Sequence, residues 1–249
     1  MFKATISEVD VFRDSVVAIG ELIDEGVFKV NKNGMSLLAA DRAMVSVVDF
    51  KMPATVFEEF KLDKDETLGV NISNFVSVVK RTKPKDKLTF ELKGNSLEVR
   101  MVNGSSRKFL VPLLDIKEED IPPIDQLDFK ANAKLKVDVL KSGVEDADVV
   151  ADTIVFHASD GKFVMKAAGD VSSTELMLEK GHDSLLDLKV SGEVNSRYPL
   201  DYMKKMIKAS KLSEEATLSW AKDYPIRLGF KAVDKVEMNF ILAPRVQDD

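Results

Sequence analysis

The chain has 249 residues, of which 45% are hydrophobic and 31% are charged, and it contains no cysteine. This length allows one large domain or two smaller ones, and the composition is normal for a globular protein. The absence of cysteine excludes disulfides, zinc–thiolate sites, iron–sulfur clusters and a cysteine nucleophile. The net charge of −6 by itself argues against nucleic-acid binding. It averages over the whole surface, however, and binding depends on where the charges lie.

No apolar run approaches the roughly 18–20 residues that a membrane-spanning helix needs. The N-terminal stretch 2–6 alternates in polarity and lacks the features of a secretory signal peptide. We therefore expect a cytoplasmic protein without a membrane partner.

The first predicted helix follows Ser7, the expected N-cap. Its apolar residues recur every three or four positions and share one face, at Val9, Phe12, Val16, Ile19 and Ile23. Strands are then predicted over 27–30 and 35–38, and Asn33-Gly34 between them predicts a hairpin turn. A further strand is expected over 43–50.

A second helix is predicted over 73–81. Strands over 87–92, 96–101 and 108–113 follow it, with turns at Gly94-Asn95 and Asn103-Gly104. The second half repeats this order, with helices over 137–149 and 199–211. Its strands are expected over 153–158, 162–167, 174–178, 217–221, 226–231 and 237–242.

The two halves align with each other at an offset of about 128 residues. Asp10-Val11-Phe12-Arg13 lies over Asp138-Val139-Leu140-Lys141, and Lys80 lies over Lys208. Between the halves, residues 117–129 combine acidic residues with Pro122-Pro123, which resists helix and central strand. We predict an α+β fold with domains over 1–116 and 130–249 joined by this linker, each with two helices packed on an antiparallel sheet.

Motifs for catalysis or metal binding are scarce. His157 and His182 do not have the spacing of metal ligands, and the sequence has no P-loop, G-x-G-x-x-G or G-x-S-x-G motif. We predict no enzyme activity, no catalytic residue, no metal site and no cofactor. A hydrolase that uses paired carboxylates is kept as an alternative, because acidic residues are abundant.

The basic residues are more informative. Lys80, Arg81 and Lys83 cluster at the end of the second predicted helix, and Lys204, Lys208 and Lys211 share one face of the fourth. Both halves therefore place positive charge at the same structural position. Such a surface suits contacts with phosphates that do not depend on base sequence.

The whole chain resembles the archaeal type of proliferating cell nuclear antigen (PCNA) sliding clamp. The resemblance is carried by Met1-Phe2, by 34–41 leading into 44–48, by 68–72 and by 242–246, together with the repeat and the linker. It implies a DNA clamp fold in which three subunits form a ring around double-stranded DNA, with helices lining the hole. It also implies a processivity factor that tethers replication and repair enzymes and has no catalytic activity.

The resemblance implies several partners. They are DNA polymerase, a clamp loader (replication factor C), flap endonuclease and DNA ligase, which bind through short peptide motifs with a glutamine and aromatic anchors. The pocket for these peptides is expected under the linker, beside the C-terminal segment. Its residues are expected to be Met44, Val47, Ile121, Pro122, Pro225, Ile241, Ala243 and Pro244.

The resemblance also assigns a DNA-facing set and a subunit interface. The DNA-facing residues are Arg13, Lys80, Arg81, Lys83, Lys141, Lys204, Lys205, Lys208 and Lys211. Two edge strands, over 107–113 and 172–178, are expected to pair between subunits of a homotrimer. The interface residues are Arg107, Lys108, Phe109, Leu110, Glu175, Leu176, Met177 and Glu179, with Arg107 and Lys108 opposite Glu175 and Glu179.

The sequence departs from the family pattern in its charges. Arg13 lies beside Asp10 and Asp14, and Lys141 shares its helix with several acidic residues. The positive lining is therefore expected mainly on the second and fourth helices. A subunit of a heterotrimeric clamp and a monomeric DNA-binding processivity protein are the alternatives within DNA replication.

Overall fold

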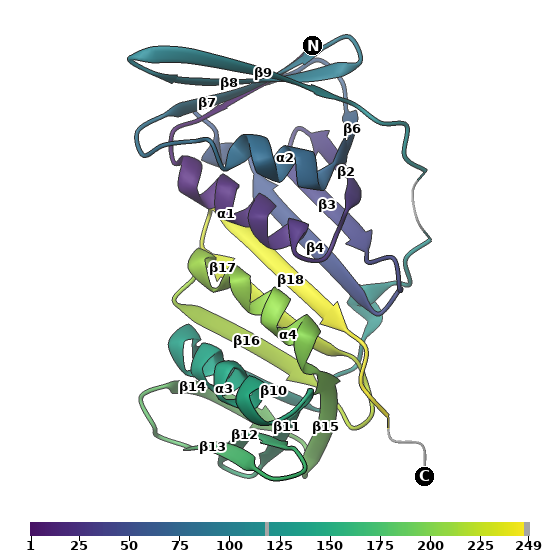
Figure 1. The fold of residues 1–249 in the computed structure, drawn as a ribbon, viewed down its shortest axis with the longest axis vertical. Coiled ribbons are helices and arrows are strands. Elements are labelled where there is room, and N and C mark those ends of the chain that lie inside the picture. Colours follow the sequence, from purple (N-terminus) through teal and green to yellow (C-terminus); the bar gives the residue numbers. More distant parts are fainter. Residues whose placement is uncertain (118–119, 247–249) are drawn as a thin grey trace. The chain divides into compact units, whose positions relative to one another are not determined.

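The computed structural model describes residues 1–117 and 120–246. The chain forms two compact units. Unit 1 comprises Met1–Arg42, Val48–Asp120 and Ala232–Met238, and unit 2 comprises Ala43–Val47, Ile121–Lys231 and Asn239–Asp249. Each unit places two α-helices against antiparallel strands (Figure 1), so the predicted α+β class is confirmed.

Unit 1 contains the helices α1 (Val9–Gly20) and α2 (Ile72–Val79). Five strands form one sheet in the order β5 (Glu59–Leu62), β1 (Phe2–Ile6), β7 (Lys87–Lys93), β8 (Ser96–Asn103) and β9 (Ser105–Pro112). A second run of neighbouring strands has the order β4 (Ser46–Pro53), β3 (Gly34–Ala40), β2 (Glu25–Asn31) and β6 (Glu66–Asn71). The short 3-10 helix η1 (Ala54–Val56) follows β4.

Close packing of the two helices organises the core of unit 1. A Cβ on Gly20 would lie 2.7 Å from Cγ2 of Val76, so the missing side chain lets α1 approach α2. Below them, the ring of Phe12 lies 4.7 Å from that of Phe90 and 6.1 Å from that of Phe75. These buried rings hold the helices on the strands and leave the opposite helix faces to solvent.

Unit 2 contains α3 (Val137–Val150), α4 (Leu200–Met206) and the 3-10 helix η3 (Ile207–Leu212), and η2 (Ile124–Gln126) lies in the linker region. One run of neighbouring strands has the order β14 (Leu185–Val190), β10 (Ala131–Lys136), β16 (Glu215–Trp220), β17 (Ile226–Ala232) and β18 (Val236–Leu242). The four-stranded sheet has the order β13 (Ser173–Glu179), β12 (Lys162–Ala168), β11 (Thr153–Ser159) and β15 (Val194–Pro199).

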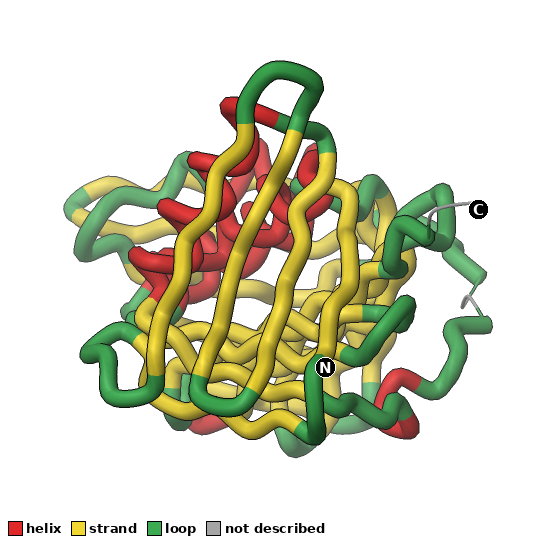
Figure 2. The backbone as a smooth tube through the Cα atoms, turned by 90° about the horizontal axis from the view of Figure 1, so that it is seen from below, coloured by secondary structure: helices red, strands yellow, loops and turns green. Residues whose placement is uncertain are grey.

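Unit 2 repeats the packing of unit 1 with different side chains. A Cβ on Gly143 would lie 2.3 Å from Cε of Met165, so α3 sits directly on β12. The rings of Phe156 and Phe163 pack around Trp220 at 6.3 and 5.9 Å. Figure 2 draws the helices in red and the strands against which they pack in yellow. Among the described residues, no helix is both long and apolar enough to cross a membrane.

Three local expectations differ from the structure. Ser7 is not the N-cap of α1, because its hydroxyl donates to the Glu58 carboxylate and Glu8 takes the cap position. Residues 43–45 precede β4 instead of belonging to it, and Met44 has a φ of 56°. The fourth predicted helix is α-helical only to Met206 and continues as η3.

Candidate functional site

The basic residues that the sequence places toward DNA differ in how they are held. In α1, Arg13 lies 3.0 Å from Asp14 and 2.6 Å from Asp10. Burial by itself lowers the pKa of Arg13, but the hydrogen bonds and charges of Asp14 and Asp10 outweigh it and raise the pKa. The guanidinium stays charged, and its two carboxylate neighbours neutralise it locally.

The end of α2 carries cations that remain free. Lys80 is the C-cap residue of α2, where a positive charge interacts favourably with the helix dipole. Lys80, Arg81 and Lys83 are exposed, and within residues 1–117 and 120–246 their side chains have no acidic partner. This end of unit 1 therefore presents a compact group of positive charges to solvent.

In unit 2 the free charge lies beyond α4. Lys141 lies 3.9 Å from Glu145, and Lys204 lies 2.7 Å from Asp148 of α3. The ammonium of Lys205 sits over the ring of Tyr202, 5.3 Å from its centroid. Two further exposed lysines have no acidic partner in the described part of the chain, and both belong to η3: Lys208 and Lys211.

The residues predicted to form the peptide pocket come from three segments of unit 2. The amide of Ala243 donates to the carbonyl oxygen of Val45 at 2.9 Å. This bond places the C-terminal segment beside Met44, whose side chain is 57% exposed. Four of the predicted residues are half-buried: Val47, Ile121, Pro225 and Pro244. Pro122 is exposed, whereas Ile241 is buried in the core. Ile241 could therefore contact a bound peptide only from beneath the exposed residues of this set.

Arg227 of β17 fixes the linker region, and sequence reasoning missed it. Its guanidinium donates to the carbonyl oxygen of Ile124 at 2.5 Å and lies 5.1 Å from the ring centroid of Phe129. The Phe129 ring in turn meets Tyr224 edge-on at 6.2 Å. An arginine in a mostly apolar strand indicates that its side chain has a specific partner. That partner is a backbone carbonyl, which the sequence cannot identify.

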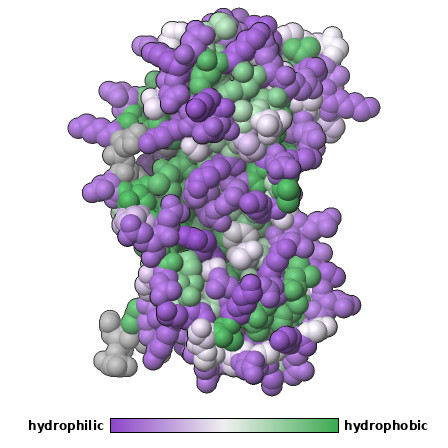
Figure 3. All heavy atoms as spheres, turned by 180° about the vertical axis from the view of Figure 1, so that it is seen from behind, coloured by the Kyte–Doolittle hydropathy of each residue, from purple (hydrophilic) through white to green (hydrophobic). Residues whose placement is uncertain are grey.

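The two strands predicted at the subunit interface are each the last strand of their sheet, β9 in unit 1 and β13 in unit 2. Both expose a large apolar side chain, because Leu110 is 59% and Met177 is 48% exposed. Phe109 and Leu176 are half-buried, and Glu175 is exposed. Figure 3 shows apolar side chains, in green, exposed among polar ones on the surface. An unpaired strand edge with exposed apolar side chains favours pairing with another chain.

The charged residues of these edges already have partners in the same chain. Lys108 lies 3.8 Å from Glu98, and Glu179 lies 3.8 Å from Lys162. Arg107 is held more firmly, by Asp86 at 2.5 Å and by the carbonyl oxygen of Arg81 at 2.8 Å. Because Arg107 is held within its own chain, we keep only Lys108 as the basic residue proposed to face Glu175 and Glu179 of another subunit.

Comparison with known proteins gives a consistent result over the full length. The model of the PCNA N-terminal domain matches residues 1–121, and that of the C-terminal domain matches residues 123–245. The chain is 34% identical to a DNA polymerase sliding clamp of Thermococcus sibiricus and 32% identical to that of Pyrococcus furiosus, each over 99% of both chains.

Solved structures agree with these matches. The crystal structure of PCNA from Thermococcus kodakaraensis has a TM-score of 0.90 and 27% identity, and the match covers 98% of this chain and all of that one. The crystal structure of a PCNA2–PCNA3 complex from Sulfolobus tokodaii has a TM-score of 0.90 and 26% identity, with the same coverage.

Proposed function

The chain belongs to the proliferating cell nuclear antigen family, and we propose that three copies of it close into a ring around double-stranded DNA. It is a DNA polymerase sliding clamp, a processivity factor of DNA replication. The observation that carries this conclusion is the match of both PCNA domain models, in order, over almost the whole chain. We keep the division into domains 1–116 and 130–249 with a linker over 117–129 as part of the proposal.

A ring holds DNA by enclosing it, so tight contacts are unnecessary. The protein then needs only weak contacts with phosphates, which salt and water can exchange rapidly while the ring slides. In this proposal the unpaired cations Lys80, Arg81, Lys83, Lys208 and Lys211 make most of these contacts. Arg13, Lys141, Lys204 and Lys205 contribute less, because acids or an aromatic ring already hold them.

Replication and repair enzymes are proposed to dock in the pocket of unit 2. Apolar anchors of a short peptide would enter beside Met44, Ile121 and Pro244, and polar backbone groups at the rim would hold its extended part. Arg227 supports this mode, since it fixes the linker beside the pocket. The proposed partners are DNA polymerase, the clamp loader, flap endonuclease and DNA ligase, and the proposed place of action is the cytoplasm, at the DNA. We propose no catalytic step for this chain.

The proposed ring closes by pairing β9 of one copy with β13 of the next. Leu110 and Met177 supply apolar contact at the two edges, and Lys108 faces Glu175 and Glu179. The opposite charges of the two edges favour copies of the same chain and set their register more than their affinity. The heteromeric alternative remains open to the same test, since one neighbour was solved as a PCNA2–PCNA3 complex.

The mass in solution tests the proposal. Light scattering behind a sizing column is expected to give about 83 kDa, three times the 27.7 kDa of one chain. A stable species of 27.7 kDa at high protein concentration would exclude the homotrimer. That result would favour a ring that needs a second type of subunit, or a monomeric processivity protein.

A further inference from the structure

The four-stranded sheet of unit 2 has one face covered by α3 and one open face. A Cβ on Gly143 of α3 would meet the side chains of Met165 and Leu176, so these two residues lie on the covered face. Side chains alternate between the two faces along a strand. Their neighbours Lys166 and Glu175, which pair across β12 and β13, therefore lie on the open face.

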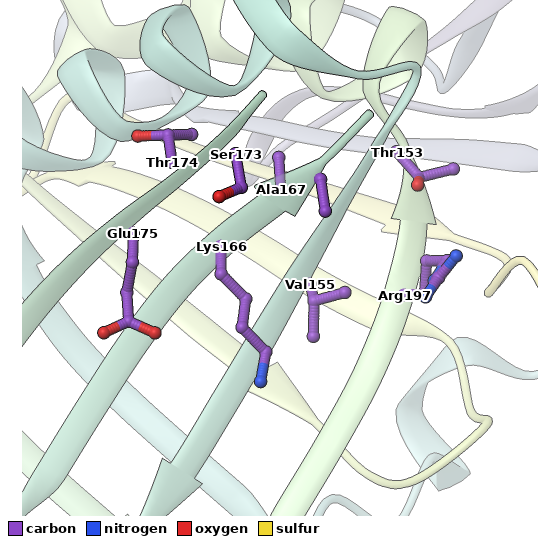
Figure 4. Close-up of a pocket in the computed structure, with 9 residues that line it drawn as sticks. Thr153, Val155, Lys166, Ala167, Ser173, Thr174, Glu175 and Arg197 are labelled. Carbon is purple, nitrogen blue, oxygen red and sulfur yellow. The ribbon is translucent and has the colours of Figure 1, made fainter. Parts of the chain in front are cut away.

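A shallow depression of about 250 Å³ lies on this open face. Its charged residues come from three strands in one cross-strand row, in which Arg197 pairs with Val155, Val155 with Lys166, and Lys166 with Glu175. Figure 4 shows Lys166 between Glu175 and Val155, with Arg197 beyond Val155. Hydroxyl groups line the open face of the same depression, from Thr153 on one side and from Ser173 on the other. Thr174 also borders the depression, but alternation places its side chain on the covered face with Leu176.

The two cations of this depression lack partners of their own. Across residues 1–117 and 120–246, neither the ammonium of Lys166 nor the guanidinium of Arg197 has an ion pair or a hydrogen bond. Nearby cations differ, since Lys162 lies 3.8 Å from Glu179 and Arg245 lies 2.9 Å from Asp152. Arg197 is half-buried, and a guanidinium with five N–H donors gains from a partner at such a position.

We propose that this depression binds a tetrahedral oxyanion, either free phosphate or the phosphate group of a small monoester. Two cations and the hydroxyl groups of Thr153 and Ser173 can donate from several directions, which suits four tetrahedral oxygens better than a planar carboxylate. The two positive charges exceed the single negative charge of Glu175, so the lining attracts anions. The inference does not depend on the enclosure of DNA.

Calorimetric titration of the full chain tests this site at constant ionic strength, set with chloride. Inorganic phosphate and glycerol phosphate are the probes, and acetate is the planar control. We expect saturable binding of the first two and weaker binding of acetate. Lys166→Gln and Arg197→Gln are each expected to weaken phosphate binding at least about tenfold, whereas Glu175→Gln is expected to tighten it.

Lys162→Gln is the matched control, because Lys162 lies on the same strand and face but is paired with Glu179; it is expected to leave phosphate binding unchanged. Light scattering on each variant checks its assembly, since Glu175 also belongs to the proposed interface strand. Tighter binding of glycerol phosphate than of phosphate assigns the site to a monoester, and the reverse assigns it to the free anion. Equal phosphate affinity in the wild type and both cation variants, or acetate binding as tight as phosphate, overturns the proposal.

Discussion

Asp86 and Arg107 form a closed ion pair inside unit 1. The guanidinium of Arg107 donates to Oδ2 of Asp86 at 2.5 Å, and the backbone amide of Lys83 donates to the same oxygen at 2.8 Å. Asp86 is only 1% exposed and the Arg107 side chain is 28% exposed, so salt screens this pair less than a pair on the surface. It joins the turn after α2, which carries free lysines, to the edge strand β9.

Asp86→Asn is expected to destabilise the protein by about 1.5–3 kcal/mol, because it removes the charge from buried hydrogen bonds. Urea unfolding measures this change, and Asp65→Asn, at an exposed position, is the control. The variant should keep the mass of the parent. A failure to assemble at unchanged stability would show instead that Arg107 acts between subunits.

Leu110→Asp and Met177→Asp are expected to break the proposed ring. A charge in an apolar contact between two strand edges should weaken association at least about tenfold, so the mass should fall toward that of one chain. Light scattering over a range of concentrations measures the effect. Val233→Asp changes an apolar residue that is even more exposed and lies outside the two edges, so its mass should equal that of the parent. A parental mass for both edge variants would contradict the interface.

Removal of free cations is expected to reduce the salt dependence of DNA binding. The slope of log K against log salt should fall by about 0.9 for each lysine–phosphate interaction that a substitution removes. Binding to duplex DNA measures this slope after Lys80→Gln, Lys208→Gln or Lys211→Gln. Lys141→Gln is the matched control, because Glu145 lies 3.9 Å from its ammonium. If substitution of Lys141 changed the salt slope as much as substitution of an unpaired lysine, the proposal that the unpaired lysines make most of the phosphate contacts would be wrong.

Ile121→Ser combined with Pro244→Ser is expected to abolish binding of a peptide with a glutamine and aromatic anchors, because the pocket then lacks apolar surface from the linker and from the C-terminal segment. Arg227→Ala should weaken the same binding, since it frees the carbonyl oxygen of Ile124, whereas Lys222→Ala should leave it unchanged. Calorimetry measures affinity and light scattering confirms assembly. Unchanged affinity in the double variant would contradict the pocket.

Glu59 is expected to make the stability of unit 1 depend on acid pH. Hydrogen bonds from Lys3 and then Lys61 lower its pKa from 4.5 to about 2, and both lysines lie 2.6 Å from it. Because the pKa of Glu59 is lower in the folded state, ionised Glu59 stabilises the fold fully above about pH 4.5. This stabilisation is lost as the pH falls toward 2. Glu59→Gln should therefore show a smaller decline of the urea midpoint over this range, and identical declines would refute the assignment.

The sequence predicted most helices and central strands because their apolar residues are large and regularly spaced. No strand was predicted at β10, where the buried positions include the small residues Ala131 and Ala133. None was predicted at β5, β6, β14 and β15 either. The strand β5 has only four residues and β14 buries only Leu185, so their alternation is weak.

Candidate charges could be located from the sequence, but their partners could not. Lys204 shares a helical face with Lys208 and looks equivalent to it, yet Asp148 of another helix lies 2.7 Å from its ammonium. The bond from Arg227 to the linker likewise depends on tertiary packing. Whether a charge is free is decided by groups that lie far away in the chain.

The change from α4 to η3 also sets the direction of two of these charges. A 3-10 helix has three residues per turn, so Lys208 and Lys211 lie in line along the helix axis, about 6 Å apart. In an α-helix the second lysine would be rotated by about 60° from the first. The tighter winding thus converts two separate lysines into a short row with one direction, and a substitution that extended the α-helix would scatter that row without removing any charge.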